Sequence, residues 1–98
     1  MKNKNDILQI IKSYQPIAQK KYGIKPLGIF GSVARGSYSE NSDIDIFYNG
    51  TAPTLLTLDR FVSDLEQLLE SKVDVVRLRT GMNPLLRAEI EREGIYAE

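Results

Sequence analysis

A Gly-Ser step and a pair of aspartates carry most of the chemistry that this sequence shows. Gly31-Ser32 is followed, after ten residues, by Asp43 and Asp45, which are separated by one isoleucine. If the apolar run Ile44–Phe47 is a strand, both carboxylates point to the same face. Two like charges about 4 Å apart repel by roughly 4 kcal/mol at an effective dielectric of about 20. A cation must relieve that repulsion, and Mg²⁺, which binds through one or two carboxylates plus phosphate oxygens, is the natural candidate.

The Gly-Ser step fits a corner between a strand and a short helical turn. Glycine lets the backbone approach a ligand closely, and free N–H groups at the start of a turn bind phosphate oxygens. The Ser32 hydroxyl would add one more donor. A tight turn capped by serine explains Gly31-Ser32 equally well, so the step alone leaves phosphate binding and a purely structural turn both open.

A third carboxylate, Asp74, lies in the β-branched run Val73–Val76, where an unpaired buried charge would be costly. Either Arg77 or a lysine pairs with Asp74, or its carboxylate joins Asp43 and Asp45 at one metal site. Three clustered carboxylates would raise at least one pKa, and bound Mg²⁺ would keep them ionised. In that second case the carboxylates and the Gly-Ser step form a two-metal phosphoryl- or nucleotidyl-transfer site, with Asp74 as the candidate general base.

Composition narrows the chemistry further. The 98 residues include 13 basic and 13 acidic side chains, but no cysteine and no histidine. This excludes disulfides, zinc sites of the usual kind and histidine general bases, so a metal must be held by oxygen ligands. The zero net charge lacks the basic surplus of a free-standing nucleic-acid binder, so we expect no direct nucleic-acid partner. No apolar run approaches the ~18 residues of a membrane span, so we expect a cytoplasmic protein without a membrane partner.

A helix is predicted near the start of the chain, where apolar residues repeat with a 3.6-residue period over residues 7–17. Asn5 or Asp6 can cap this helix at its N-terminus. Pro16 should kink or interrupt it, because proline lacks the backbone donor that a helix interior needs. Gly23 fits the end of the helix.

The remaining elements alternate between strands and helices. Strands are predicted at residues 24–30, 43–48 and 73–78, with a last short strand at 95–96. A helical turn is predicted at 31–35. Two further helices are predicted, one from Thr54 or Thr57 to about residue 70 and one from Asn83-Pro84 to Gly94. The order α-β-α-β-α-β-α with short connections predicts one sheet covered by helices, in a single domain spanning residues 1–98.

The segments Phe30–Gly36 and Ser42–Ile46 resemble the signature of the polymerase-β-like nucleotidyltransferase superfamily, which is a Gly-Ser step, ten residues and Asp-x-Asp. The short length and the Ala-Arg-Gly continuation are similar to those of the minimal nucleotidyltransferases (MNT), the MntA-like antitoxins paired with HEPN-domain toxins. The resemblance spans nearly the whole chain, and Asp74 matches the third acidic residue of the family.

This resemblance implies an α+β domain of two layers, with an α-β-α-β-α-β core and a small mixed sheet. It also implies ATP as nucleotide donor, two Mg²⁺ ions, and transfer of AMP to a tyrosine of the HEPN partner, an RNase toxin that the transfer silences. By position, Gly31 and Ser32 would bind the triphosphate, and Asp43, Asp45 and Asp74 would bind metal.

The basic side chains near these motifs have open roles. Arg35 could contact phosphate or the partner, or it could brace the loop by pairing with an acid such as Glu40. Arg77 and Arg79 share a strand face opposite the one that carries Asp74, so solvated or partner-facing positions are expected for them.

Two further alternatives concern residue types that often have a purely structural role. Tyr38 and Tyr48 could stack on a nucleotide base, but tyrosine is also ordinary core and rim material, which is the interpretation we favour. Asp43 and Asp45 could also be two solvated side chains on an exposed sheet face, although the apolar residues around them argue against this.

Three classes of function compete for the whole chain. The leading hypothesis is a Mg²⁺-dependent nucleotidyltransferase that acts on a protein hydroxyl. The second is a binding module that inhibits its partner by occlusion without catalysis. The third is a small-molecule transferase of the aminoglycoside nucleotidyltransferase type, although those enzymes usually carry an extra helical domain for the acceptor.

Overall fold

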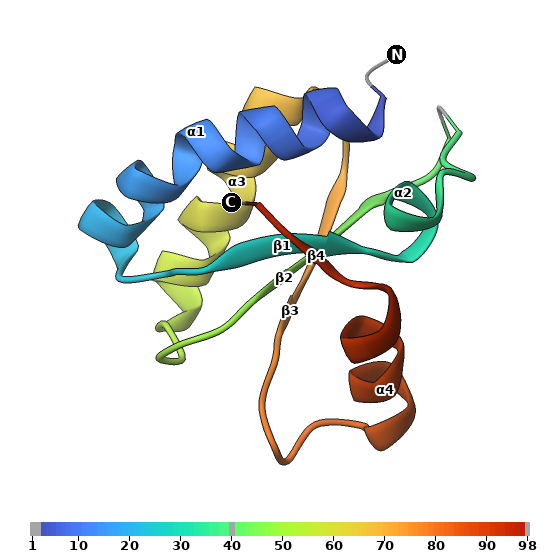
Figure 1. The fold of residues 1–98 in the computed structure, drawn as a ribbon. Coiled ribbons are helices and arrows are strands. Elements are labelled where there is room, and N and C mark those ends of the chain that lie inside the picture. The colour runs from blue at the N-terminus through green and yellow to red at the C-terminus, as the bar shows by residue number, and fades with distance from the viewer. Residues whose placement is uncertain (1–2, 40, 98) are drawn as a thin grey trace.

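The computed structural model of the chain describes residues 3–39 and 41–97, and helices and strands alternate along them (Figure 1). In chain order the elements are α1 (Lys4–Tyr22), β1 (Leu27–Phe30), α2 (Gly31–Arg35), β2 (Ile44–Tyr48), α3 (Leu55–Leu69), β3 (Val73–Arg77), α4 (Pro84–Glu93) and β4 (Ile95–Tyr96). The predicted order of elements is confirmed, including the short last strand.

The strands form one mixed sheet in the order β3-β2-β1-β4. Strand β1 runs antiparallel to both β2 and β4, whereas β2 and β3 are parallel. Parallel neighbours need a crossover connection, and α3 supplies it between β2 and β3. The α+β class with a small mixed sheet, expected from the resemblance, is confirmed.

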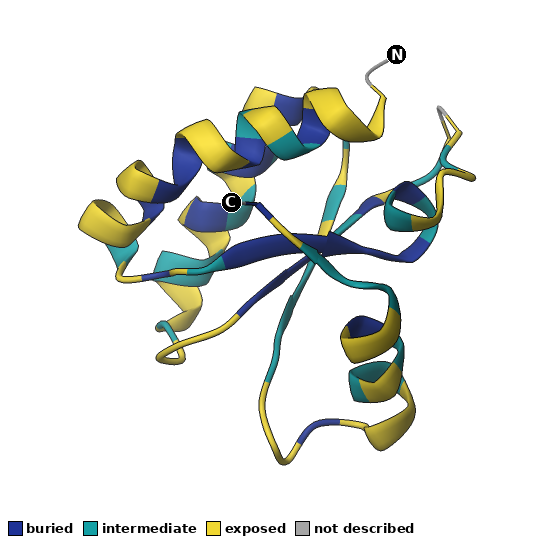
Figure 2. Ribbon diagram, in the orientation of Figure 1, coloured by how far each residue is buried: buried dark blue, intermediate teal, exposed yellow. Residues whose placement is uncertain are grey.

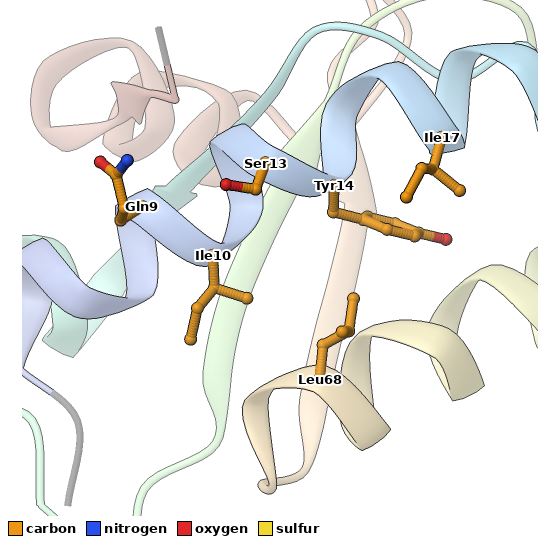
Figure 3. Close-up of a pocket in the computed structure, with 6 residues that line it drawn as sticks. All are labelled: Gln9, Ile10, Ser13, Tyr14, Ile17 and Leu68. Carbon is orange, nitrogen blue, oxygen red and sulfur yellow. The ribbon is translucent and has the colours of Figure 1, made fainter.

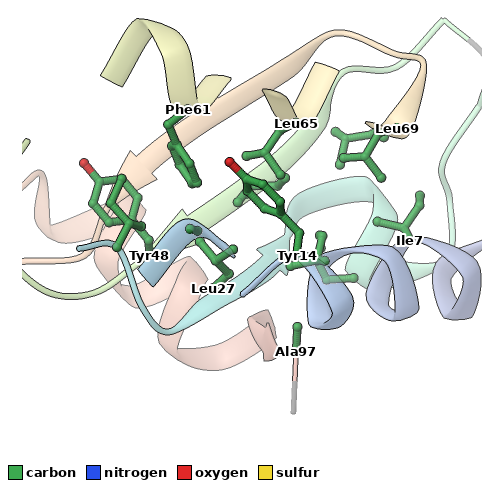
Figure 4. Packing of buried hydrophobic residues seen from close by; sticks show 14 of the residues in the cluster. Ile7, Tyr14, Leu27, Tyr48, Phe61, Leu65, Leu69 and Ala97 are labelled. Carbon is green, nitrogen blue, oxygen red and sulfur yellow. The ribbon is translucent and has the colours of Figure 1, made fainter. Parts of the chain in front are cut away.

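Helices α1 and α3 pack on one face of the sheet and bury the larger core (Figures 1, 2 and 4). Phe61 of α3 lies at its centre, in contact with the rings of Tyr14, Tyr22 and Tyr48 at centroid distances of 5.8 to 6.2 Å. These aromatic contacts join both helices to strand β2, so the α1–α3 layer and the sheet form one packed unit.

The opposite face of the sheet is covered in part by α4, which packs on a smaller cluster formed by Phe30, Phe47, Met82 and Ile90. Side chains alternate along β2, so Ile44, Ile46 and Tyr48 enter the larger core while Phe47 enters the smaller one. By the same alternation, the side chain of Asp45 belongs to the α4 side of the sheet.

Helix α1 differs from the prediction in its N-cap residue and in the effect of Pro16. Its cap is Asn3, not Asn5 or Asp6: the Asn3 side chain accepts from the Asp6 amide at 2.8 Å, and the Asp6 carboxylate accepts from the Asn3 amide at 3.2 Å. Pro16 does not divide the helix, because it lies on the solvent-exposed face, where water can bond the carbonyl of Lys12 that proline leaves unpaired. No helix of the described residues, α1 included, is long and apolar enough to cross a membrane.

The first strand is shorter than the predicted range of 24–30. It starts at Leu27 because Pro26 has no N–H group for the ladder, although the Pro26 carbonyl still accepts from the Asn49 amide at 3.2 Å. The predicted apolar face of α1 also reaches further than the buried one, and α3 has one partly exposed leucine beside it. Ile17 is 50% exposed and Leu68 is 45% exposed, and both lie at the outer edge of the α1–α3 layer, where they line an open groove (Figure 3).

Gln15 is the buried polar side chain that ties this layer to the sheet and to the C-terminal segment. Its Oε1 accepts from the Leu27 amide at 2.8 Å, and its Nε2 donates to the carbonyl of Ala97. One amide side chain therefore satisfies two buried backbone groups from segments far apart in the sequence.

We predict that Gln15→Ala lowers the free energy of unfolding by about 2–4 kcal/mol, because two buried backbone groups lose their partners. Urea unfolding measures this change. The matched control is Gln19→Ala, an exposed glutamine of the same helix, for which we expect a change within roughly 0.5 kcal/mol. Similar losses in the two variants would contradict the role assigned to Gln15.

Candidate active site

The Gly-Ser step turns the chain from β1 into α2, as predicted. Gly31 is buried and has a φ of +69°, a conformation that glycine adopts without strain. A Cβ at Gly31 would collide with the carboxylate of Asp45, so the absent side chain is what allows this carboxylate to lie against the backbone of the turn. Ser32 follows as a half-buried residue of α2.

The sheet register brings two of the predicted acidic residues together. Asp45 of β2 is the direct partner of Asp74 in the parallel strand β3, and Asp43 lies just before β2 begins. Asp45 is half-buried, whereas Asp43 and Asp74 are exposed. The predicted neighbourhood of Gly31, Asp45 and Asp74 is thus present at one end of β2 and β3.

The environment of Asp74 differs from the one that its β-branched run suggests. It is exposed because β3 is an edge strand, so the cost of a buried charge does not apply to it. Within residues 3–39 and 41–97, neither Arg77 nor a lysine forms an ion pair with Asp74. The guanidinium of Arg77 instead donates to the carbonyl of Gly50 at 3.3 Å, so the structural pairing considered for Asp74 is not found.

Asp45 has the most perturbed carboxylate of the site. Burial, together with the negative charges of Asp74, Glu89 and Asp43, raises its pKa from 3.8 to about 6, against an opposing effect of Arg35. Several acids therefore act on one half-buried carboxylate, which is the electrostatic problem that the spacing of the aspartates predicts.

The donor set fits a hard divalent cation. All of its members are carboxylate oxygens, the ligands that Mg²⁺ prefers, and an ion beside Asp45 would offset the repulsion that raises its pKa. In the part of the chain that the structure describes, no three acidic side chains already form a closed ligand group. Mg²⁺ does not require one, since it commonly takes one or two carboxylates and completes its shell with waters and phosphate oxygens.

Glu89 and Glu93 on α4 were missed by the sequence analysis. The Arg35 Nη1 atom lies 2.8 Å from the Oε2 atom of Glu93 and 3.5 Å from the Oε1 atom of Glu89. Its hydrogen bond to Glu93 lowers the pKa of that carboxyl and raises the pKa of Arg35. Arg35 thus braces α2 against α4, the structural role considered for it, but with these two acids; Glu40 lies outside the described residues.

The other basic and aromatic candidates lie away from the acidic residues. Arg77 donates to the carbonyl of Gly50 in the loop after β2, and Arg79 donates at 3.0 Å to the carbonyl of Arg77, the last residue of β3, so both stabilise backbone near that end of the two strands. Tyr48 is buried in the larger core and Tyr38 packs against it, which agrees with the packing interpretation of both residues.

The chain was compared with known families and with single proteins. A family model described as "Polymerase beta, Nucleotidyltransferase" matches residues 5–96. "Putative protein adenylyltransferase MJ1379" of Methanocaldococcus jannaschii is 34% identical over 99 residues, which span 98% of this chain and 99% of that protein.

Solved structures show the same likeness. One named "putative minimal nucleotidyltransferase" is 34% identical, with a TM-score of 0.76 over 96% of this chain and 95% of the other. The complex of a tri-AMPylated Shewanella oneidensis HEPN toxin with an MNT antitoxin contains a chain that is 22% identical, with a TM-score of 0.60 over 98% of this chain and 69% of the other. At 22% identity, the likeness to the chain in the Shewanella oneidensis complex supports the fold alone.

We predict that Gly31→Ala destabilises the chain more than Gly36→Ala. Both glycines have positive φ, +69° and +80°, so both variants carry the strain of about 1 kcal/mol that alanine meets there. Only at Gly31 does the new Cβ also collide with Asp45, whereas it meets nothing within 4 Å at Gly36. Because the carboxylate of Asp45 can rotate away from the new Cβ, urea unfolding should show a difference of about 1 kcal/mol between the variants. Equal losses would contradict the contact.

A second prediction concerns pH. Because the pKa of Asp45 is higher in the folded chain, at about 6, than its ordinary value of 3.8, the ionised carboxylate destabilises the fold at neutral pH. Acidification through pH 6 relieves this cost, and below 3.8 the group has no further effect because both states are protonated. In chelator at about pH 7.5, Asp45→Asn should therefore raise the Tm by roughly 5 °C, which corresponds to about 1 kcal/mol after allowance for solvent screening.

The same melting experiment holds its own control. The advantage of Asp45→Asn should shrink as the pH falls to about 4.5, and Asp59→Asn, at an exposed position of α3, should show no such trend. A gain that does not depend on pH, or none at all, would contradict the electrostatic account of Asp45.

Proposed function

The chain belongs to the polymerase β nucleotidyltransferase family, and on that basis we propose that it transfers AMP from ATP to a tyrosine hydroxyl of a HEPN-family RNase toxin, as the antitoxin of that toxin. The relative from Methanocaldococcus jannaschii is named a protein adenylyltransferase, which supports AMP as the transferred group and a protein as the acceptor. The Shewanella oneidensis complex pairs an MNT antitoxin with an AMPylated HEPN toxin, which supports the kind of partner.

The observation that carries the proposal is the contact between the Gly31 turn and the carboxylate of Asp45. One metal ion must contact both the protein carboxylates and the triphosphate. The turn that binds phosphate must therefore lie next to the carboxylates that bind metal. In the proposed site Gly31 and Ser32 hold the triphosphate, and Asp43, Asp45 and Asp74 hold two Mg²⁺ ions. Arg35 is placed beside them by Glu93 and Glu89 and is a weaker candidate for a phosphate contact.

The proposed reaction is one displacement at phosphorus. The tyrosine oxygen forms a bond to the α-phosphorus of ATP, the bond from that phosphorus to the bridging α–β oxygen breaks, and pyrophosphate leaves. Asp74 accepts the proton of the tyrosine hydroxyl as general base. Bound Mg²⁺ would neutralise part of the phosphate charge and lower the pKa of the attacking hydroxyl.

The shape of the site suits an acceptor on another protein. Asp74 and Asp43 are exposed, and β3 is an edge strand with no neighbour on its outer side among the described residues. The candidate general base is therefore open to solvent and can be approached by a loop of a partner protein. A deep pocket for a small acceptor would bury Asp74 more completely.

The proposal is tested with purified chain, ATP, Mg²⁺ and the separately purified HEPN protein. Mass spectrometry of the HEPN protein should show a gain of one or more AMP units on tyrosine. The double variant Asp43→Asn/Asp45→Asn should lower the rate by roughly a thousandfold or more, since several kcal/mol of charge stabilisation are lost. Asp59→Asn, an exposed aspartate of α3, is the matched control and should retain full activity.

The same variants separate catalysis from occlusion. If the double variant neutralises the toxin as well as the unaltered chain does, the chain acts as a non-catalytic binding module and the proposed transfer is wrong. If AMP appears on a small molecule such as an aminoglycoside but not on the HEPN protein, the acceptor class is wrong while nucleotidyl transfer stands.

A further inference from the structure

A pocket of about 340 Å³ lies where β2 and β3 end, and it is not part of the acidic site. Its polar side chains are Tyr48, the last residue of β2, Arg77, the last residue of β3, and Arg79, which follows β3. Its walls are apolar and come from the loop before α3, from α3 and from β3, with Pro53, Leu58 and Val75 among them. Small-molecule sites have this composition, mostly apolar with a few convergent polar groups, and volumes of roughly 300–1,000 Å³.

The hydroxyl of Tyr48 is a donor without a partner. Tyr48 is only 3% exposed, and its ring packs against Phe61 in the larger core. Figure 4 shows the hydroxyl oxygen at the margin of that core, pointing away from the other side chains. Among residues 3–39 and 41–97 this hydroxyl has no hydrogen-bond partner, yet no side-chain oxygen there is sealed from water without one. The hydroxyl therefore opens onto the pocket that Tyr48 lines, where a ligand can accept its hydrogen bond.

Two guanidinium groups of the same pocket keep donors free for a ligand. Arg77 Nη1 donates to the Gly50 carbonyl at 3.3 Å, and Arg79 Nη1 donates to the Arg77 carbonyl at 3.0 Å. These bonds hold both side chains in place but use one of the five N–H donors of each. Inside the described ranges neither arginine forms an ion pair, so both positive charges are left without a carboxylate.

Both charges act on the Tyr48 hydroxyl. Burial raises the pKa of Tyr48, and the positive charges of Arg77 and Arg79 oppose that rise. The two guanidinium groups and the hydroxyl are thus close enough to act on one ligand together.

These three groups match one ligand chemistry. An oxyanion can accept hydrogen bonds from the phenol and from both guanidinium groups, and it neutralises charge that the chain leaves unpaired. The apolar walls suit a body attached to that oxyanion. We propose that Arg77, Arg79 and Tyr48 form a binding site for a small molecule that carries a phosphate monoester or a carboxylate on an apolar body.

The pocket is separate from the proposed nucleotide site and does not depend on it. Tyr48 lies three residues after Asp45 in β2, which is about 10 Å along the strand and on the opposite face of the sheet. A ligand held by the two arginines therefore needs neither Mg²⁺ nor the Gly31 turn.

Amide NMR titrations of the full chain in chelator, without Mg²⁺, test the site. The probes are phenyl phosphate and benzoate, with inorganic phosphate and acetate as the same oxyanions without an apolar body. At least one aromatic probe should give saturable shifts centred on Tyr48, Arg77 and Arg79, with a Kd of about 1 mM or tighter. The aromatic probe that binds more tightly decides between phosphate and carboxylate.

Three variants separate a built site from general attraction of anions. Tyr48→Phe keeps the ring but loses the donor and should weaken binding roughly three- to tenfold, and Arg79→Gln should weaken it roughly tenfold or more. Arg60→Gln is the matched control, because it removes the same charge from an exposed position of α3 outside the pocket and should bind normally. Circular dichroism and Tm confirm that each variant is folded.

Four results would overturn the proposal. They are no saturable shift at these residues up to about 20 mM of either aromatic probe, binding that is unchanged in both Tyr48→Phe and Arg79→Gln, equal affinity for an aromatic probe and its small anion, and shifts centred instead on Gly31 and Ser32. The last result would place the anion at the turn of the proposed nucleotide site and leave that proposal standing.

Discussion

The carboxylate of Asp45 lies against the backbone of Gly31, and the rest of the structure holds this contact in place. A side chain at position 31 would prevent it, and the Asp45 carboxylate is there repelled by Asp74, Glu89 and Asp43. Such an arrangement is unfavourable in the isolated chain and persists only because the surrounding packing fixes both partners. Phe30 directly precedes Gly31, and Phe47 lies two residues after Asp45. Both rings are buried under α4 and hold the turn and the strand in place. Packing in the smaller core thus offsets the electrostatic repulsion at the site.

The two faces of the sheet have different tasks. The face toward α1 and α3 buries a large aromatic and aliphatic core and holds Gln15 in its bonds to Leu27 and Ala97. The face toward α4 has few buried residues and holds the acidic side chains. Because side chains alternate along β2, one strand serves both faces: Ile44 and Ile46 stabilise the fold while Asp45 belongs to the site.

Much of this could be predicted from local patterns, because they act over a few residues. The order of elements and the Gly31 turn follow from apolar periodicity and glycine. The register that pairs Asp45 with Asp74 does not, because local patterns left open whether Asp74 joins the other carboxylates or forms an ion pair. Features that depend on tertiary context could not be predicted in this way. Pro16 stays within α1 because the fold exposes that side of the helix, and Asp74 is exposed because β3 lies at the sheet edge. Glu89 enters the site only because α4 packs back beside α2, which no local pattern indicates.

The central claim is that metal and nucleotide bind together where the Gly31 turn meets Asp45. An amide NMR titration with paramagnetic Mn²⁺ in place of Mg²⁺, beside a non-hydrolysable ATP analogue, tests it most directly, because Mn²⁺ broadens only nearby resonances. The account predicts that the amides of Gly31, Ser32, Asp45 and Asp74 broaden first while those of α1 stay sharp. Broadening centred on any other part of the chain, or none at these four residues at saturating nucleotide, would contradict it.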